Sequence, residues 1–157
     1  MRDRSIAAVA VAVTLFAGIA VAGCGSSSSS SSSSSASTAA TGITKAQFVA
    51  KANAICAAGN KATNAALSPI TKKTSQSQSV VIVKTAFVPA VQTQITAIKA
   101  LGAPAGDEAT VNKMVTYAQQ DLNKIKKDPT LVFSGKDQFH NFAVIAHPYG
   151  LVQCDKQ

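Results

Sequence analysis

Ten consecutive serines, Ser26–Ser35, separate an apolar N-terminal stretch from the rest of this chain. Residues 36–42 continue the small, polar composition, so residues 25–42 have nothing to bury and are expected to form a disordered tether. As a flexible coil such a tether spans about 21–25 Å. O-linked sugars on the serines are an alternative to a plain spacer. Only residues 43–157 are left to build a core, which is a normal length for one domain.

The stretch before the serines has the three parts of a secretory signal. Met1–Arg4 is basic, residues 6–21 are almost entirely apolar, and small residues precede Cys24. This pattern resembles the signal peptide and lipobox of bacterial lipoproteins. The resemblance implies cleavage between Gly23 and Cys24 and a diacylglycerol on the Cys24 thiol, with N-acylation left open. It also implies a lipid-anchored protein on the extracytoplasmic face of the cell membrane.

The N-terminal stretch has two other interpretations. A permanent transmembrane helix needs about 20 apolar residues, and residues 6–21 are shorter and rich in alanine. A plain secretory signal would leave Cys24 as an unpaired thiol, which secreted proteins usually avoid. The lipoprotein interpretation is preferred because signal, small residues and cysteine are in register.

Residues 43–157 contain four helical patterns and no clear strand–turn–strand alternation. Amphipathic helices with short links predict an all-α fold, an antiparallel bundle of about four helices. The expected helices are 44–67, 78–101, 107–127 and 136–146.

Local signals set the limits of these helices. Thr44 and Gln47 form a capping box at the first start, and Pro69 ends that helix near Leu67. Pro89 is expected to kink the second helix, and the β-branched run Val80–Val83 leaves a strand there as an alternative.

The last two helices carry clear apolar faces. Asp107 and Glu108 suit the start of the third helix, and lysines suit its end. Residues 131–133 are expected to add a short turn before the fourth helix. His147-Pro148 and Gly150 are expected to end the fourth helix. The residues on the faces of the third and fourth helices are Val111, Met114, Val115, Ala118, Leu122, Ile125, Phe139, Phe142, Ala143 and Ala146.

The chain has three cysteines. If Cys24 takes a lipid, Cys56 and Cys154 remain as an even pair in an oxidising compartment, and we expect a disulfide between them. It would close a loop of about 100 residues, worth up to about 4.7 kcal/mol in the chain-entropy model. A redox-active pair is the weaker alternative, because such cysteines usually stand close together in the sequence.

The net charge of +8 favours anionic partners. Both arginines precede Cys24, so the bidentate contacts that read bases are missing and nucleic acid is a poor candidate. Anionic lipid headgroups, acidic wall polymers or an envelope protein are the expected partners. The preferred interpretation of the charge, however, is a solvated, lysine-rich face that binds no specific partner, because most of the lysines are scattered along the sequence.

Asp137, His140 and His147 are the only candidate metal ligands. The histidines are seven residues apart rather than the four of a helical metal pair, so we expect surface histidines and no cofactor. No nucleophile elbow, phosphate-binding loop or metalloprotease motif occurs, and the acidic pair Asp107-Glu108 suits a helix start. Catalysis is not expected.

Three patches resemble a group of small, uncharacterised lipoproteins of high-GC Gram-positive bacteria. They are residues 48–56, 101–108 and 149–154, with His147-Pro148 as a departure from the group. The resemblance implies a helical domain stapled by the two cysteines and supplies no activity. The sequence therefore predicts a lipid-anchored binding or structural module. A carrier of a small or apolar ligand in an interhelical cavity is the alternative, and an envelope enzyme using His140 is a weaker one.

Overall fold

The computed structural model describes residues 42–154, and every element in that range is helical. The elements are α1 (Lys45–Leu67), α2 (Gln76–Ile82), the π-turn η1 (Val83–Phe87), α3 (Val88–Ala100), α4 (Glu108–Lys127), the 3₁₀ turn η2 (Pro129–Phe133) and α5 (His140–Tyr149). The predicted signal, with Gly23 and Cys24, the serine tether up to residue 41, and residues 155–157 lie outside the described part.

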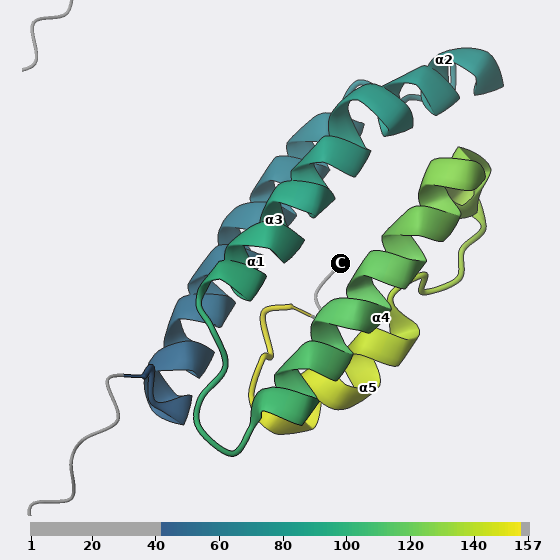
Figure 1. Cartoon of the computed structure of the whole chain (residues 1–157). Coiled ribbons are helices and arrows are strands. Elements are labelled where there is room, and N and C mark those ends of the chain that lie inside the picture. The colour runs from purple at the N-terminus through teal and green to yellow at the C-terminus, as the bar shows by residue number, and fades with distance from the viewer. Residues whose placement is uncertain (1–41, 155–157) are drawn as a thin grey trace, which may run out of the picture. The chain divides into compact units, whose positions relative to one another are not determined.

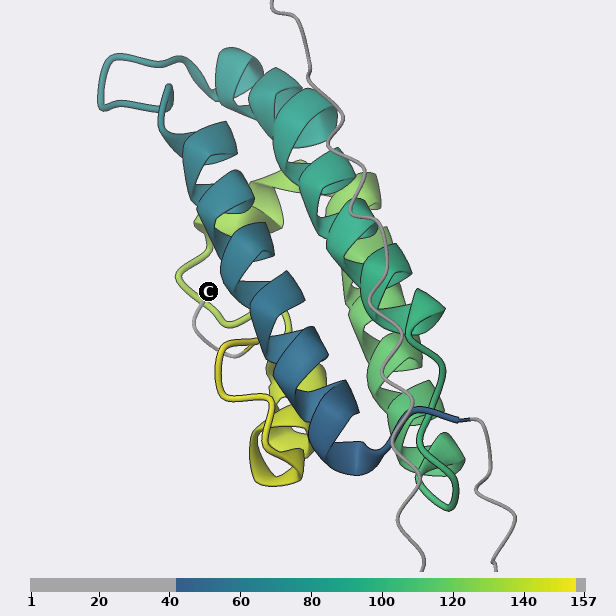
Figure 2. The same ribbon diagram turned by 90° about the vertical axis from the view of Figure 1, so that its left-hand side faces the viewer.

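The helices pack as the predicted antiparallel bundle (Figures 1 and 2). α2, η1 and α3 follow one another without a break and return along α1. α4 runs back along α3, and α5 returns along α4. We call the end where α1 begins and α3 finishes the near end, and the end where α1 and α4 finish the far end.

The first helix matches its prediction at both limits. The Gln47 backbone N–H donates to Thr44 Oγ1 at 3.2 Å, and the Thr44 N–H donates to Gln47 Oε1 at 3.0 Å. This reciprocal capping box satisfies two amides that the first turn leaves without partners. The helix ends at Leu67, two residues before Pro69, as expected.

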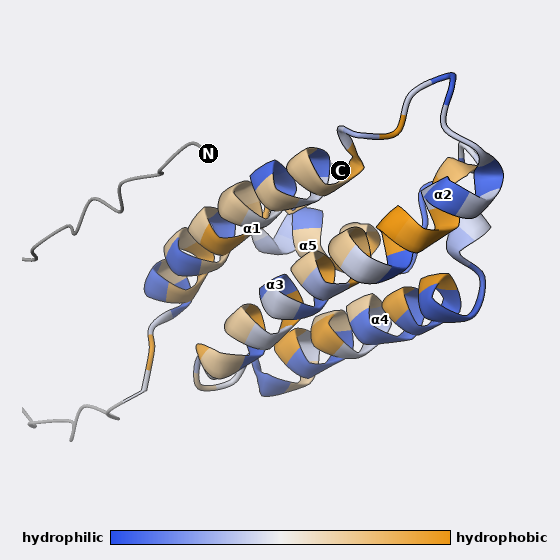
Figure 3. Cartoon of the chain, turned by 90° about the horizontal axis from the view of Figure 1, so that it is seen from above, coloured by the Kyte–Doolittle hydropathy of each residue, from blue (hydrophilic) through white to orange (hydrophobic). Residues whose placement is uncertain are grey.

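The second helix starts earlier than the sequence pattern indicated. Ser75 and Gln78 form another capping box, with the Ser75 N–H donating to Gln78 Oε1 at 3.0 Å. A hydroxyl residue followed three positions later by glutamine also begins the first helix. The sequence therefore contained the information needed to predict a start at Gln76. The strand alternative for Val80–Val83 is wrong, because the run is helical and joins α2 to η1 (Figure 3).

The π-turn Val83–Phe87 is explained by the spacing of buried residues. Four residues exceed one α-helical turn by about 40°, so repeated steps of four rotate away from the core. A π-turn accommodates more residues per turn, and here the Val88 N–H donates to Val83 O, five residues back. The sequence predicted a kink at Pro89, and the structure has its irregular turn just before that proline. The buried residues spaced by four are Ser79, Val83, Phe87, Val91 and Ile95.

The predicted start of the fourth helix, Lys136, is wrong by four residues, because α5 begins at His140. Before it, Gly135 has φ 71°, a left-handed conformation that breaks the helix. The Asp137 carboxylate then accepts a hydrogen bond from the Phe139 N–H at 2.9 Å. This side-chain bond stabilises a turn and takes the place of the backbone bond that a helix would form there. The short turn expected at 131–133 is present within η2.

The predicted end at Ala146 is also wrong, since α5 continues through Pro148 to Tyr149. A proline in the last turn removes one N–H donor without ending the helix. Gly150, the second of the two expected stop signals, ends it at φ 105°. The Leu151 N–H donates to Ala146 O at 2.9 Å, which is the long bond of a Schellman cap.

The core is built largely from the predicted apolar faces. Phe48, Met114 and Leu122 are almost completely buried, whereas Val115 and Ala143 from the predicted faces are half-buried. The C-terminal segment after α5 was not predicted to be part of the core, yet Leu151 is fully buried. One helix in the described range, Gln76–Ala100, is long and apolar enough to cross a membrane, but it supplies core residues to the bundle.

Helices α1 and α3 approach closely where Gly59 faces Gln94. A Cβ on Gly59 would lie 2.3 Å from Gln94 Oε1 and 2.9 Å from Gln94 Cγ. The Gln94 side chain is buried, and its Oε1 accepts no hydrogen bond from any described residue. A hydrogen on the Gly59 Cα therefore points at this oxygen, the arrangement of a weak C–H···O contact.

We predict that Gly59→Ala destabilises the bundle by about 1 kcal/mol, because overpacking outweighs the gain in helix propensity of about 1 kcal/mol. In a Gln94→Ala background the clash is absent, and the same substitution should raise the free energy of unfolding. Urea denaturation of the four variants of this cycle measures both effects. Equal effects of Gly59→Ala in the two backgrounds would refute the close contact.

Candidate functional site

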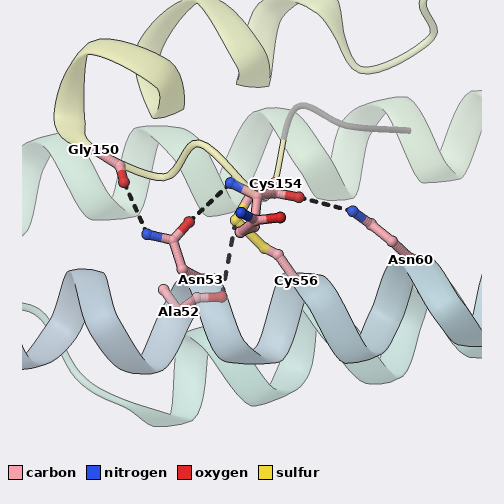
Figure 4. The surroundings of a disulfide bond; sticks show 7 residues. Ala52, Asn53, Cys56, Asn60, Gly150 and Cys154 are labelled. Carbon is pink, nitrogen blue, oxygen red and sulfur yellow. Dashed lines mark hydrogen bonds between the residues drawn. A yellow bond between two sulfur atoms is a disulfide. The ribbon is translucent and has the colours of Figure 1, made fainter.

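The predicted disulfide is present and joins the middle of α1 to the last described residue. The Cys56 and Cys154 Cα atoms are 4.9 Å apart, and both residues are buried in the core (Figure 4). Cys154 Sγ also lies 3.9 Å from Ala52 O, a packing contact, because a disulfide sulfur has no hydrogen to donate. The pair is inaccessible to solvent, which favours the structural role over the redox alternative.

Two asparagines on the same face of α1 hold the C-terminal segment beside the disulfide (Figure 4). Asn53 Nδ2 donates to Gly150 O at 2.9 Å, and Asn53 Oδ1 accepts the Gln153 N–H at 2.9 Å. Asn60 Nδ2 donates to Gln153 O at 2.7 Å. We call these contacts and the disulfide the C-terminal attachment. The sequence interpretation missed the asparagines, although they flank Cys56 at helical spacings of three and four.

A second polar cluster closes the near end of the bundle. The Tyr149 hydroxyl donates to Asp107 Oδ2 at 2.7 Å, and Lys45 Nζ lies 3.7 Å from the same oxygen. Lys45 also sits 4.3 Å from the centre of the Tyr149 ring, which packs edge-on against Phe48. Asp107 was expected only to offset the dipole of α4, but its carboxylate makes no capping bond and instead joins three elements.

This cluster raises the pKa of the Tyr149 hydroxyl well above its usual value. Burial is the largest cause, and the hydrogen bond to Asp107 and the negative charge of that residue add to it. Each of these disfavours the phenolate. Tyr149 is therefore held as a neutral hydrogen-bond donor, and the cluster is suited to stabilising the fold.

The candidate metal ligands are brought together only in part. His140 Nδ1 lies 3.8 Å from Asp137 Oδ2, and both side chains are mostly exposed. Among the described residues, no group of three or more histidine, cysteine or acidic side chains could hold a metal ion, and His147 does not join the pair. A single exposed imidazole–carboxylate pair is too few ligands for the metal sites weighed from the sequence.

One hollow formed by the described residues lies at the far end and is large enough for a small ligand. It has a volume of about 190 Å³ and is bounded by the end of α1, η1, the end of α4, η2 and the segment before α5. Its apolar lining residues are Leu67, Phe87, Ile125, Val132 and Phe139, and its polar ones are Asn60, Thr63, Asn64, Lys136, Asp137 and Gln138. By contrast, the void between α3, α4 and α5 measures only about 20 Å³, room for about one water.

The far end also carries many of the lysines. Lys124 pairs with the buried Asp121 at 2.7 Å, and Lys126 donates to Gln92 Oε1 at 2.8 Å. Lysines outnumber aspartates at the far end, so this end of the bundle has an excess of positive charge. The lysines there are Lys72 and Lys73 in the α1–α2 loop, Lys124, Lys126 and Lys127 in the last turn of α4, and Lys136; the aspartates are Asp121, Asp128 and Asp137.

Comparison of the chain with protein-family models, with curated proteins and with solved structures gives no match. The candidate site is therefore argued from the geometry of this chain.

Removing the disulfide with Cys56→Ala and Cys154→Ala should lower the free energy of unfolding by about 2–5 kcal/mol, because the bond closes a long loop. Asn53→Ala should lower it by about 1–3 kcal/mol, because two backbone groups of the C-terminal segment lose their partner. Urea denaturation measures both, with Ala57→Ser on the exposed face of α1 as control. A midpoint for either variant equal to that of the control would contradict these roles.

Stability should also fall at alkaline pH in a way that depends on Tyr149. Its folded pKa lies above the unfolded value of about 10, so its contribution is complete below pH 10 and is lost as the pH rises toward the folded pKa. Tyr149→Phe should lower stability at pH 7 and flatten the decline above pH 10. Chemical denaturation at several pH values, with Tyr117→Phe as control, tests this, and an unchanged slope would disprove it.

Proposed function

We propose that the chain is a lipid-anchored extracytoplasmic protein whose helical domain is a binding or interaction module. The observation that carries this proposal is the buried Cys56–Cys154 disulfide. Disulfides of this kind persist in oxidising compartments, outside the cytoplasm. The pair also accounts for two of the three cysteines, so Cys24 is the one left for the lipid.

The anchor follows from the chemistry of the proposed acyl chains. Each buried methylene contributes about 0.8 kcal/mol, and two chains hold a protein stably where one is marginal. The described chain enters the bundle at the near end, through Gly42 and Ile43. A basic far end suits an anionic envelope partner such as an acidic wall polymer or an anionic lipid surface.

A second candidate function is the carriage of a small ligand. It is favoured by one observation, the hollow of about 190 Å³ at the far end. Three of its walls, Phe87, Ile125 and Phe139, are buried aromatic or aliphatic side chains, and its edge is polar. An apolar interior with a few polar groups at the edge is the usual composition of a small-molecule site.

The anchor is tested with Cys24→Ala in the intact chain. The variant should leave the membrane fraction or remain uncleaved, and it should lose labelling by an alkyne fatty-acid probe, because no thiol is left to acylate. The double variant Cys56→Ala, Cys154→Ala is the matched control and should still be labelled. Continued labelling of Cys24→Ala would sink the proposal.

A further inference from the structure

The hollow at the far end has the size of a small organic molecule. A buried apolar cavity of about 150 Å³ is known to admit benzene. The hollow here is somewhat larger, about 190 Å³, and it is open at its edge, where Lys136 and Asp137 are exposed. It therefore has room for one ring or a short branched chain together with a small polar head group.

The walls are formed by parts of the chain whose backbone departs from regular α-helix. Phe87 is the last residue of the π-turn, and Val132 belongs to the 3₁₀ turn η2. Phe139 follows the turn that Gly135 and Asp137 form. π-turns inside helices are frequently found at functional sites. The hollow is therefore bounded by three segments of irregular backbone.

Most polar groups at the edge of the hollow are already occupied. The Thr63 hydroxyl donates to Asn60 O at 3.0 Å, and Gln138 Nε2 donates to Ser134 Oγ at 2.9 Å. The Asp137 carboxylate accepts the Phe139 N–H and lies beside His140. These groups are therefore less available to a ligand.

Two groups at the edge remain available. The Lys136 ammonium forms no ion pair, and the Asn64 side-chain amide forms no hydrogen bond, with any residue between 42 and 154. One is a cation and the other can donate a hydrogen bond, so both suit the oxygens of an anion. The excess of lysines at this end adds a field of the same sign, which attracts anions to the opening.

We propose that the far-end hollow binds a small organic anion with an apolar body. The ring or short branched chain packs against Phe87, Ile125 and Phe139, and the carboxylate lies beside Lys136 and Asn64. This proposal rests on the carrier function proposed above and does not depend on the lipid anchor.

The test is a titration of the mature chain, followed by ¹H–¹⁵N spectra. The protein is used as isolated, in phosphatidylcholine nanodiscs if it carries lipid and in buffer if it does not, with empty nanodiscs as the blank for partitioning. The probes are the anions phenylacetate and 4-methylpentanoate, neutral phenylacetamide, and cationic phenethylamine. At least one anion should give saturable shifts at the amides of residues 135–139. It should bind about fivefold more tightly than phenylacetamide, the effect of one exposed ion pair.

Variants separate the head-group contact from the apolar pocket. Lys136→Gln should weaken binding of the anion about fivefold and leave phenylacetamide unchanged. The matched control is Lys99→Gln, an exposed lysine at the near end, which should change neither. Val132→Phe should fill the hollow and abolish binding of every probe, with an otherwise native spectrum as evidence that it folds.

Each outcome decides the proposal. Absence of saturable shifts with both anions overturns it, as does binding that survives in Val132→Phe. Equal or tighter binding of phenylacetamide overturns the choice of an anion while the carrier function stands. Membrane release of Cys24→Ala is measured separately, so failure of the ligand proposal and failure of the anchor are distinguishable.

Discussion

The covalent bond between Cys56 and Cys154 is the constraint on which the rest of this fold depends. The last described segment, after α5, has no helix of its own. The disulfide and the two asparagines beside it tie that segment to α1, which places Leu151 in the core and draws α5 against the bundle. Because the bond spans 98 residues, it restricts the unfolded chain strongly.

The two ends of the bundle differ in how they are closed. At the near end, Tyr149, Asp107 and Lys45 join the starts of two helices to the end of a third, and regular helices meet there. At the far end, a π-turn, a 3₁₀ turn and the loop after Gly135 meet instead. The hollow and the excess of lysines lie at that end, as does Lys136, which forms no ion pair with another described residue. Both the carrier function and its ligand are therefore proposed there.

Local signals accounted for much of the fold. The capping box at Thr44, the proline stops and the apolar faces identified the four helical segments, and cysteine counting identified the disulfide. The errors lie at helix limits, where one local signal competed with another. His147-Pro148 indicated a helix end, but α5 continues to Gly150, whose Schellman cap directs Leu151 into the core. The sequence predicted a helix start at Lys136. The Asp137 carboxylate instead accepts the Phe139 N–H in a turn, and the helix begins only after that turn. The hollow has no sequence signature, because its walls come from five separate segments.

The sequence by itself determined the helical class, the number of helices and the pairing of Cys56 with Cys154, because caps, apolar periodicity and cysteine number act within short stretches or through simple counting. It also carries a pattern that resembles a lipobox, on which the proposed lipid anchor rests. Only the tertiary structure decided that Asn53 and Asn60 hold the C-terminal segment, that Tyr149 donates to Asp107, and that the far end is left hollow. Those features depend on which faces of separate helices meet, and residues distant in the chain carry no local mark of that meeting.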